Sequence, residues 1–171
     1  HGTEVVINGG AITAANAEEG TAIYHPQDGL LTVNGGTVSA PTGIEMRSGT
    51  LTVNAGAIKS TVSTFDEKGN GSGTTMTGVA VAVSQHVTDK DLKVVINGGT
   101  LTGPYALYEK DLQNETGTKA LEIKDGIFEG QVYSKDCTAF IKGGTFSDVS
   151  ALESEERALI YLTDDAKLSF V

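Results

Sequence analysis

One nine-residue block recurs six times along the chain, and this repeat constrains the fold more than any other feature. Each copy begins with apolar residues at alternating positions, continues through Asn-Gly-Gly or a variant of it, and ends in a second short apolar stretch. The copies are Val5–Thr13, Leu31–Ser39, Leu51–Lys59, Val94–Thr102, Leu121–Glu129 and Ala139–Ser147. Their starts lie 26, 20, 43, 27 and 18 residues apart. Internal repeats of this length are typical of stacked structural units.

A second, weaker block lies between the copies. Its members are Ala22–Tyr24, Gly43–Glu45, Ala80–Ala82, Ala106–Tyr108 and Gln131–Tyr133. Each repeat therefore holds three short stretches with period-two alternation, which predicts three strands that cannot stand alone. The sequence predicts an all-β, right-handed parallel β-helix of about six rungs over residues 1–148. Residues 149–171 leave the repeat, and we expect them to form a C-terminal cap or docking segment.

The repeat predicts which side chains face inward, because like residues lie over like in a solenoid. Four inward columns are expected. They are Val5, Leu31, Leu51, Val94, Leu121 and Ala139; Ile7, Val33, Val53, Ile96, Ile123 and Ile141; Ile12, Val38, Ile58, Leu101, Phe128 and Phe146; and Ile23, Ile44, Val81, Leu107 and Val132.

The Asn-Gly-Gly motif predicts a corner of the coil. Glycine supplies 22 residues, and it adopts positive φ at little steric cost. The asparagines, which are Asn8, Asn34, Asn54 and Asn97, fall at one corner, where stacked amides form a hydrogen-bonded ladder. Lys124 and Lys142 occupy the same place in the last two copies and end it. We interpret these asparagines as structural.

Several segments interrupt the repeat. Residues 60–78, 84–92 and 110–119 are expected to leave the wall as loops, and solenoid insertions often lie on a binding face. Beyond the last copy, residues 150–157 have the spacing of a capping box and predict a short helix. Residues 159–162 and 167–171 read as strands.

Composition excludes several functional classes. The formal net charge is -10 with only 12 Lys and Arg residues, so no basic patch for nucleic acid is expected. No apolar run reaches the roughly 20 residues of a membrane span. Cys137 is the only cysteine, so it forms no intramolecular disulfide, and we expect it to be a small buried residue. The chain opens directly on a strand pattern, which suggests a piece of a longer protein or a processed chain.

The rungs resemble those of pectate-lyase-like right-handed parallel β-helices. The Ile/Val-Asn-Gly-Gly-Thr motif and the turn at residues 23–29, Ile-Tyr-His-Pro-Gln-Asp-Gly, are more similar to repeat proteins of Gram-positive bacterial surfaces and phage virions. The resemblance covers about residues 3–148. It implies a non-catalytic structural or adhesive module in an extracellular setting: an adhesin segment, a fibre, or a capsid or tail decoration. β-helical fibres of this kind often trimerise, so a homo-oligomer or a larger parent assembly is a further expectation.

An outward column supplies the candidate ligand-binding residues. Tyr24, Glu45, Ala82, Tyr108 and Tyr133 lie next to the inward Ile23 column, and Tyr105 and Arg47 lie beside them. Tyrosines on one wall are suited to stacking against sugar rings or to packing against another subunit. We therefore predict a glycan or host-surface ligand at Tyr24, Glu45, Arg47, Tyr105, Tyr108 and Tyr133. The alternative interpretation is that these tyrosines only fit a strand surface.

Catalysis is the second hypothesis. Related enzymes cleave acidic polysaccharides with clustered aspartates and an Arg or Lys, which suggests a polysaccharide lyase or glycoside hydrolase. The aspartates of this chain are scattered, and only Glu45 and Arg47 combine opposite charges on neighbouring wall positions. We assign no catalytic residue, no metal site and no cofactor. His25 reads as a turn residue, while the acidic turn at residues 89–91 offers oxygen ligands for calcium without a repeated aspartate loop.

Overall fold

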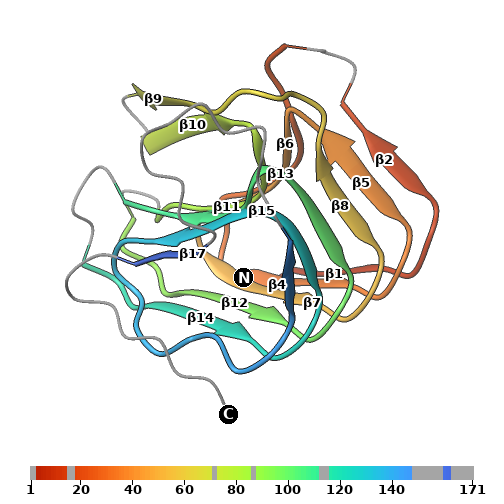
Figure 1. The fold of residues 1–171 in the computed structure, drawn as a ribbon. Helices are drawn as coiled ribbons and strands as arrows, with labels where there is room; N and C mark the ends of the chain where they lie inside the picture. The colour runs from red at the N-terminus through yellow and green to blue at the C-terminus, as the bar shows by residue number, and fades with distance from the viewer. Residues whose placement is uncertain are drawn as a thin grey trace.

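The computed structural model describes residues 3–14, 18–70, 73–85, 88–111, 116–147 and 160–162. Within these ranges every regular element is a strand, and no helix is long and apolar enough to span a membrane. The strands wind around one apolar interior, as Figure 1 shows in a view close to the coil axis. Parallel pairing joins the strands of the coil to their counterparts in the next repeat, while β9 (Asp66–Asn70) and β10 (Gly73–Thr77) pair only with each other. The predicted all-β parallel β-helix is confirmed.

Three walls enclose the interior. The first wall is β1 (Thr3–Ile7), β4 (Gly29–Val33), β7 (Gly49–Val53), β12 (Leu92–Ile96) and β14 (Lys119–Ile123). The second is β2 (Ala11–Thr13), β5 (Thr37–Ala40), β8 (Ala57–Ser60), the first parts of β13 (Thr100–Glu109) and β15 (Ile127–Ser134), and β16 (Thr145–Ser147). The third is β3 (Thr21–His25), β6 (Thr42–Met46), β11 (Val79–Val83), the second parts of β13 and β15, and β17 (Ile160–Leu162). The described residues thus form five complete rungs and a shortened sixth.

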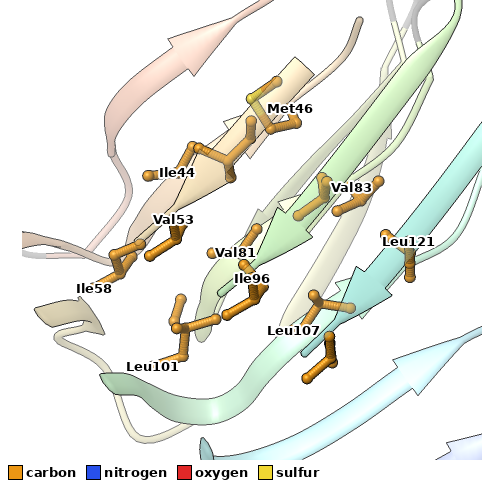
Figure 2. Packing of buried hydrophobic residues seen from close by; sticks show 14 of the residues in the cluster. Ile44, Met46, Val53, Ile58, Val81, Val83, Ile96, Leu101, Leu107 and Leu121 are labelled. Carbon is orange, nitrogen blue, oxygen red and sulfur yellow. The ribbon is translucent and has the colours of Figure 1, made fainter. Parts of the chain in front are cut away.

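The strand register places the four inward columns as the repeat predicts, with one exception at the last rung. For example, Ile44 pairs with Val81, and Val81 pairs with Leu107. These side chains are fully buried, and Figure 2 shows them pointing into the same interior as Ile58 and Leu101. Because each column continues through successive rungs, half-apolar strands build a continuous core.

The exception is a one-residue shift at the last copy of the repeat. Ala139 was expected to face inward, but it is exposed and has a φ of 49°, while Phe140 is buried in the core. The left-handed backbone at Ala139 turns the chain, so that the larger Phe140 side chain fills the interior. The register recovers at the next residue, where Ile141 forms a parallel bridge with Ile123.

The Asn-Gly-Gly corner is confirmed as a ladder of amides. Asn34 Nδ2 donates to Asn8 Oδ1 at 2.9 Å, and the next two steps, from Asn54 to Asn34 and from Asn97 to Asn54, are both 2.8 Å. The glycine that ends each corner has positive φ, from 84° at Gly10 to 127° at Gly126. An L-residue rarely adopts this backbone, which explains why glycine recurs there.

The longest interruption is a hairpin of antiparallel strands. Within the predicted loop at residues 60–78, β9 (Asp66–Asn70) pairs with β10 (Gly73–Thr77), and the hairpin lies outside the coil beside β11 and β13 (Figure 1). The strand predicted at residues 159–162 is present as β17. The helix predicted at 150–157, the strand predicted at 167–171 and most of the proposed cap at 149–171 lie outside the described residues.

Candidate functional site

The outward column predicted for ligand binding exists as a stack of paired residues on the third wall. Tyr24 pairs with Glu45, Glu45 with Ala82, Ala82 with Tyr108 and Tyr108 with Tyr133. We call this stack the tyrosine wall. Its members come from five successive rungs, so parallel pairing alone holds their backbones about 4.8 Å apart.

The middle of the tyrosine wall is covered. Tyr108 is only 4% exposed, and it packs with Met76 of β10, Val79 and Ala82 in a small apolar cluster outside the main core. Phe65, which precedes β9, joins this cluster with its ring centroid 4.8 Å from that of Tyr108. The hairpin therefore turns the expected exposed platform into a second, smaller core.

The aromatic rings of the cluster pack in ordered pairs. The rings of Tyr108 and Tyr133 are stacked with centroids 4.7 Å apart, while those of Tyr105 and Tyr108 meet edge to face at 4.9 Å. Phe65 also meets Tyr105 edge to face at 4.6 Å. Offset and edge-to-face pairs of this kind add roughly 0.5–1.5 kcal/mol each beyond their burial.

Polar contacts fasten the hairpin to the coil. Glu67 of β9 accepts a hydrogen bond from the Tyr108 hydroxyl at 3.3 Å, and it forms an ion pair with Lys110 Nζ at 2.7 Å. Lys68 of β9 also pairs at 3.0 Å with Glu19, which lies just before β3, and both side chains are mostly exposed. Burial, together with the nearby Glu67 carboxylate, raises the pKa of the Tyr108 phenol far above its ordinary value of 10.

Glu45 and Arg47 form a buried ion pair. Arg47 Nη1 lies 3.4 Å from Glu45 Oε1, and the two residues are 1% and 3% exposed. The Thr21 hydroxyl lies 3.5 Å from the other Glu45 oxygen. Burial raises the pKa of Glu45, and the Arg47 guanidinium opposes that shift. The outward placement of Glu45 is thus confirmed in register, but neither charged group lies at the surface.

The six predicted binding residues separate into two groups. Glu45, Arg47 and Tyr108 are buried. Tyr24 is 50% exposed, and Tyr105 and Tyr133 are partly exposed at the border of the aromatic cluster. The wall therefore brings Tyr105, Tyr108 and Tyr133 together, while Tyr24 lies three rungs away from Tyr108 along the column.

Sequence reasoning missed a buried polar corner at the ends of the third-wall strands. Met46, Val83, Glu109 and Ser134 pair in register and are all fully buried. Glu109 Oε2 accepts hydrogen bonds from the Ser134 hydroxyl at 2.7 Å and from the Asp136 amide at 2.8 Å, while its Oε1 has no partner. Burial raises the pKa of this carboxyl. The alternation that directs Tyr108 outward also directs Glu109 inward, and that signal was available in the sequence.

Cys137 lies at the same corner and is buried, as expected. Its amide donates to Ser134 Oγ at 3.0 Å. Burial and the Glu109 charge raise the pKa of the thiol to about 12. Because the thiolate is the reactive form, this cysteine is suited to packing and poorly suited to nucleophilic chemistry.

A shallow groove of about 280 Å³ lies on the first wall. Asp28 lines it from the turn before β4, and Asp91 and Lys93 line it from the start of β12. All three side chains are exposed. The groove therefore offers two carboxylates and an ammonium group to solvent on the outside of the coil.

The described residues include no group of three or more His, Cys, Asp or Glu side chains that could hold a metal ion. In the acidic turn at residues 89–91, Asp89 Oδ1 accepts from the Thr116 amide at 2.6 Å, and Asp91 Oδ1 accepts from the Thr118 amide at 3.1 Å. No protein-family model, no curated protein and no solved structure matches the chain.

Proposed function

We propose that the chain is a non-catalytic structural or adhesive module displayed on a bacterial cell or phage virion surface. The observation that carries this proposal is the burial of the charged and phenolic groups on and beside the tyrosine wall. Glu45, Arg47 and Tyr108 are at most 4% exposed, so they cannot reach a polymer without a rearrangement. A stack of parallel rungs with a hydrogen-bonded corner suits a mechanical or display role.

Adhesion is assigned to the exposed rings. Tyr24 and Tyr133 of the wall, and Tyr105 beside it, reach solvent at least in part, and ring faces of this kind stack on sugars. The proposed ligand is a glycan or another host-surface group, and the proposed assembly is a homo-oligomer such as a trimer or a larger parent structure. The setting proposed for both is extracellular.

A glycan array tests the adhesive role. We expect binding to a defined glycan class, and we expect Tyr133→Ala and Tyr24→Ala to weaken it by about tenfold each if each ring stacks on one sugar. Leu30→Ala, which truncates a half-exposed apolar side chain on the first wall, should leave the binding unchanged. Sedimentation of the chain measures the assembly. If the chain bound none of the glycans and surfaces tested, the adhesive role would be contradicted and only the structural role would stay proposed.

One observation favours a second candidate, a glycoside hydrolase or polysaccharide lyase. Asp28 and Asp91 line the groove on the first wall, and glycoside hydrolysis commonly uses two carboxylates. Incubation with acidic polysaccharides tests this function. Cleavage that is lost in Asp28→Asn and in Asp91→Asn, but kept in Glu45→Gln, would assign catalysis to the groove and contradict the non-catalytic proposal.

A further inference from the structure

The outer side of the first wall carries two columns of side chains that run along the coil axis. The residues between them, such as Leu31 and Val94, point inward and are 1% exposed, so alternation directs both columns outward. Parallel pairing fixes the order of the columns from β1 to β14. The first is Glu4, Leu30, Thr50, Lys93 and Ala120, and the second is Val6, Thr32, Thr52, Val95 and Glu122. We call these residues the first-wall face.

Over the first four rungs, the order of side chains on the first-wall face is self-complementary. The first column begins with an acid, Glu4, and reaches a base, Lys93, at the fourth rung. The second column reads Val, Thr, Thr and Val, which is the same in both directions. A two-fold axis that lies in the face, parallel to the strands and between β4 and β7, reverses this order. It would bring Glu4 of one copy to Lys93 of a second copy, and Leu30 to Thr50.

The relief of the first-wall face is complementary in the same sense. Leu30 is 50% exposed and Val6 is 46% exposed, so apolar side chains project from the first two rungs. The shallow groove of about 280 Å³ lies over the later rungs, where Thr50 and Lys93 line it. Val95, at the fourth rung, is only 8% exposed and forms a flat floor. The two-fold axis therefore lays the projecting half of each copy over the hollowed half of the other.

The charges of the first-wall face follow the same division. Glu4 and Lys93 are exposed, and neither forms a hydrogen bond or an ion pair within the part of the chain that the structure describes. Glu122, which lies on the fifth rung outside the self-complementary order, pairs with Lys124 at 3.4 Å and with Lys142 at 2.7 Å. The coil thus compensates the charge that the axis leaves unmatched, and it leaves free the two charges that the axis would bring together.

We propose that the first-wall face is the contact between two copies of this chain, related by this two-fold axis. Each copy supplies Leu30 to the groove of the other, and an ion pair of Glu4 with Lys93 lies on either side of this apolar centre. Strand spacing of about 4.8 Å and a rise of about 3.3 Å per residue give the matched rungs roughly 300 Å² per copy, so the contact belongs to the weak, transient class. The inference rests on the homo-oligomer proposed above, because it names the interface of that assembly.

Sedimentation equilibrium of the full chain, from about 10 µM to 1 mM at low salt, tests the contact. We expect a monomer–dimer equilibrium with a Kd on the order of 100 µM. Glu4→Lys and Lys93→Glu each place two like-charged pairs in the contact, so each should weaken dimerisation at least tenfold. An equimolar mixture of the two variants has opposite charges at both pairs again, and so does the double variant. In both cases the Kd should return to within about threefold of the original.

Leu30→Ser tests the apolar centre, and Ile127→Ser is its matched control on the second wall, where Ile127 is 44% exposed. The first should weaken dimerisation about tenfold and the second should leave it unchanged, while circular dichroism confirms that both variants fold. A mixture of the charge variants that dimerises no better than either alone would overturn the two-fold contact. A trimer, or a dimer that ignores these substitutions, would overturn the contact but keep the proposed oligomer. A monomer at every concentration would overturn both.

Discussion

The asparagine corner and the tyrosine wall are both columns of side chains that run along the coil axis on its outer side. At the corner, each amide bonds to an identical amide one rung away at 2.8–2.9 Å. On the wall, a tyrosine pairs with a glutamate, the glutamate with an alanine, and the alanine with another tyrosine. The corner repeats one interaction, whereas the wall combines different ones.

This difference shows how a solenoid accommodates irregular side chains. A ladder of identical groups is satisfied by stacking alone and stays exposed. In a mixed column, unlike neighbours do not supply one another's packing and hydrogen bonds, and the inserted hairpin supplies them here. Phe65 and Met76 cover Tyr108, and Glu67 accepts a hydrogen bond from the Tyr108 hydroxyl. The wall thus depends on contacts from outside the repeat, and substitutions there should cost more than substitutions at the corner.

The largest effect is expected at the covered part of the wall. Tyr108→Ala removes a buried ring with aromatic contacts to Phe65 and Tyr133, so the free energy of unfolding should fall by about 3–5 kcal/mol. Tyr24→Ala in the same column, at a half-exposed position, should cost less than about 0.5 kcal/mol. Urea unfolding of both variants measures the contrast. Equal costs would show that the hairpin does not cover the wall in solution.

A slightly smaller effect is expected at the buried ion pair. Arg47→Met leaves the Glu45 carboxylate buried beside a neutral side chain, which should lower the free energy of unfolding by about 3 kcal/mol near neutral pH. The loss should shrink as the pH falls toward the ordinary Glu value of 4.5, because protonation removes the uncompensated charge. Unfolding curves across this pH range measure it. A cost that does not change with pH would contradict the pairing.

Substitutions in the asparagine corner should lower the free energy of unfolding modestly, by an amount that depends on the position in the ladder. Asn54→Ala removes two ladder bonds and should cost about 1–2 kcal/mol, whereas Asn8→Ala removes one and should cost about half as much. Thermal unfolding of the two variants compares an interior step with the end step. If Asn8→Ala were the more damaging change, the ladder would not be the source of the stability.

The smallest effect is a pH dependence of the free energy of unfolding that comes from the inward-facing Glu109. Because burial raises the pKa of Glu109 in the folded state, that state holds its proton at pH values where the unfolded chain has released it. The contribution of Glu109 to stability is therefore full below 4.5 and decreases as pH rises toward the folded pKa. Glu109→Gln should flatten this part of the stability profile. An unchanged profile in Glu109→Gln would assign the dependence to another group.

Much of the fold was predictable because the repeat encodes it locally. Alternation fixed the inward columns from Ile7 to Ile141, and Asn-Gly-Gly located the corner and its amide ladder. The prediction failed at Ala139, where a left-handed residue shifts the alternation by one position. Nothing in the pattern of that copy distinguishes Ala139-Phe140 from an ordinary inward–outward pair.

For the candidate site, the sequence predicted only which residues pair in one column. Pairing between rungs placed Tyr24, Glu45, Tyr108 and Tyr133 in one column, as the repeat indicates. The burial of Tyr108 depends on residues 60–78, whose polar, glycine-rich sequence suggests a loop and gives no sign of where it packs. Contacts such as Glu67 with Lys110 join positions 43 residues apart, and one sequence alone does not pair them.

The central claim, that the hairpin closes the tyrosine wall, is tested most directly by a pH titration of the tyrosine rings followed by NMR. With rings assigned through Tyr→Phe variants, the Tyr108 signal should stay in its neutral form well above pH 10, where an exposed tyrosine ionises, until the fold is lost. A Tyr108 ring that titrates with a midpoint near 10 in the folded chain would contradict the closed wall and return these residues to the surface.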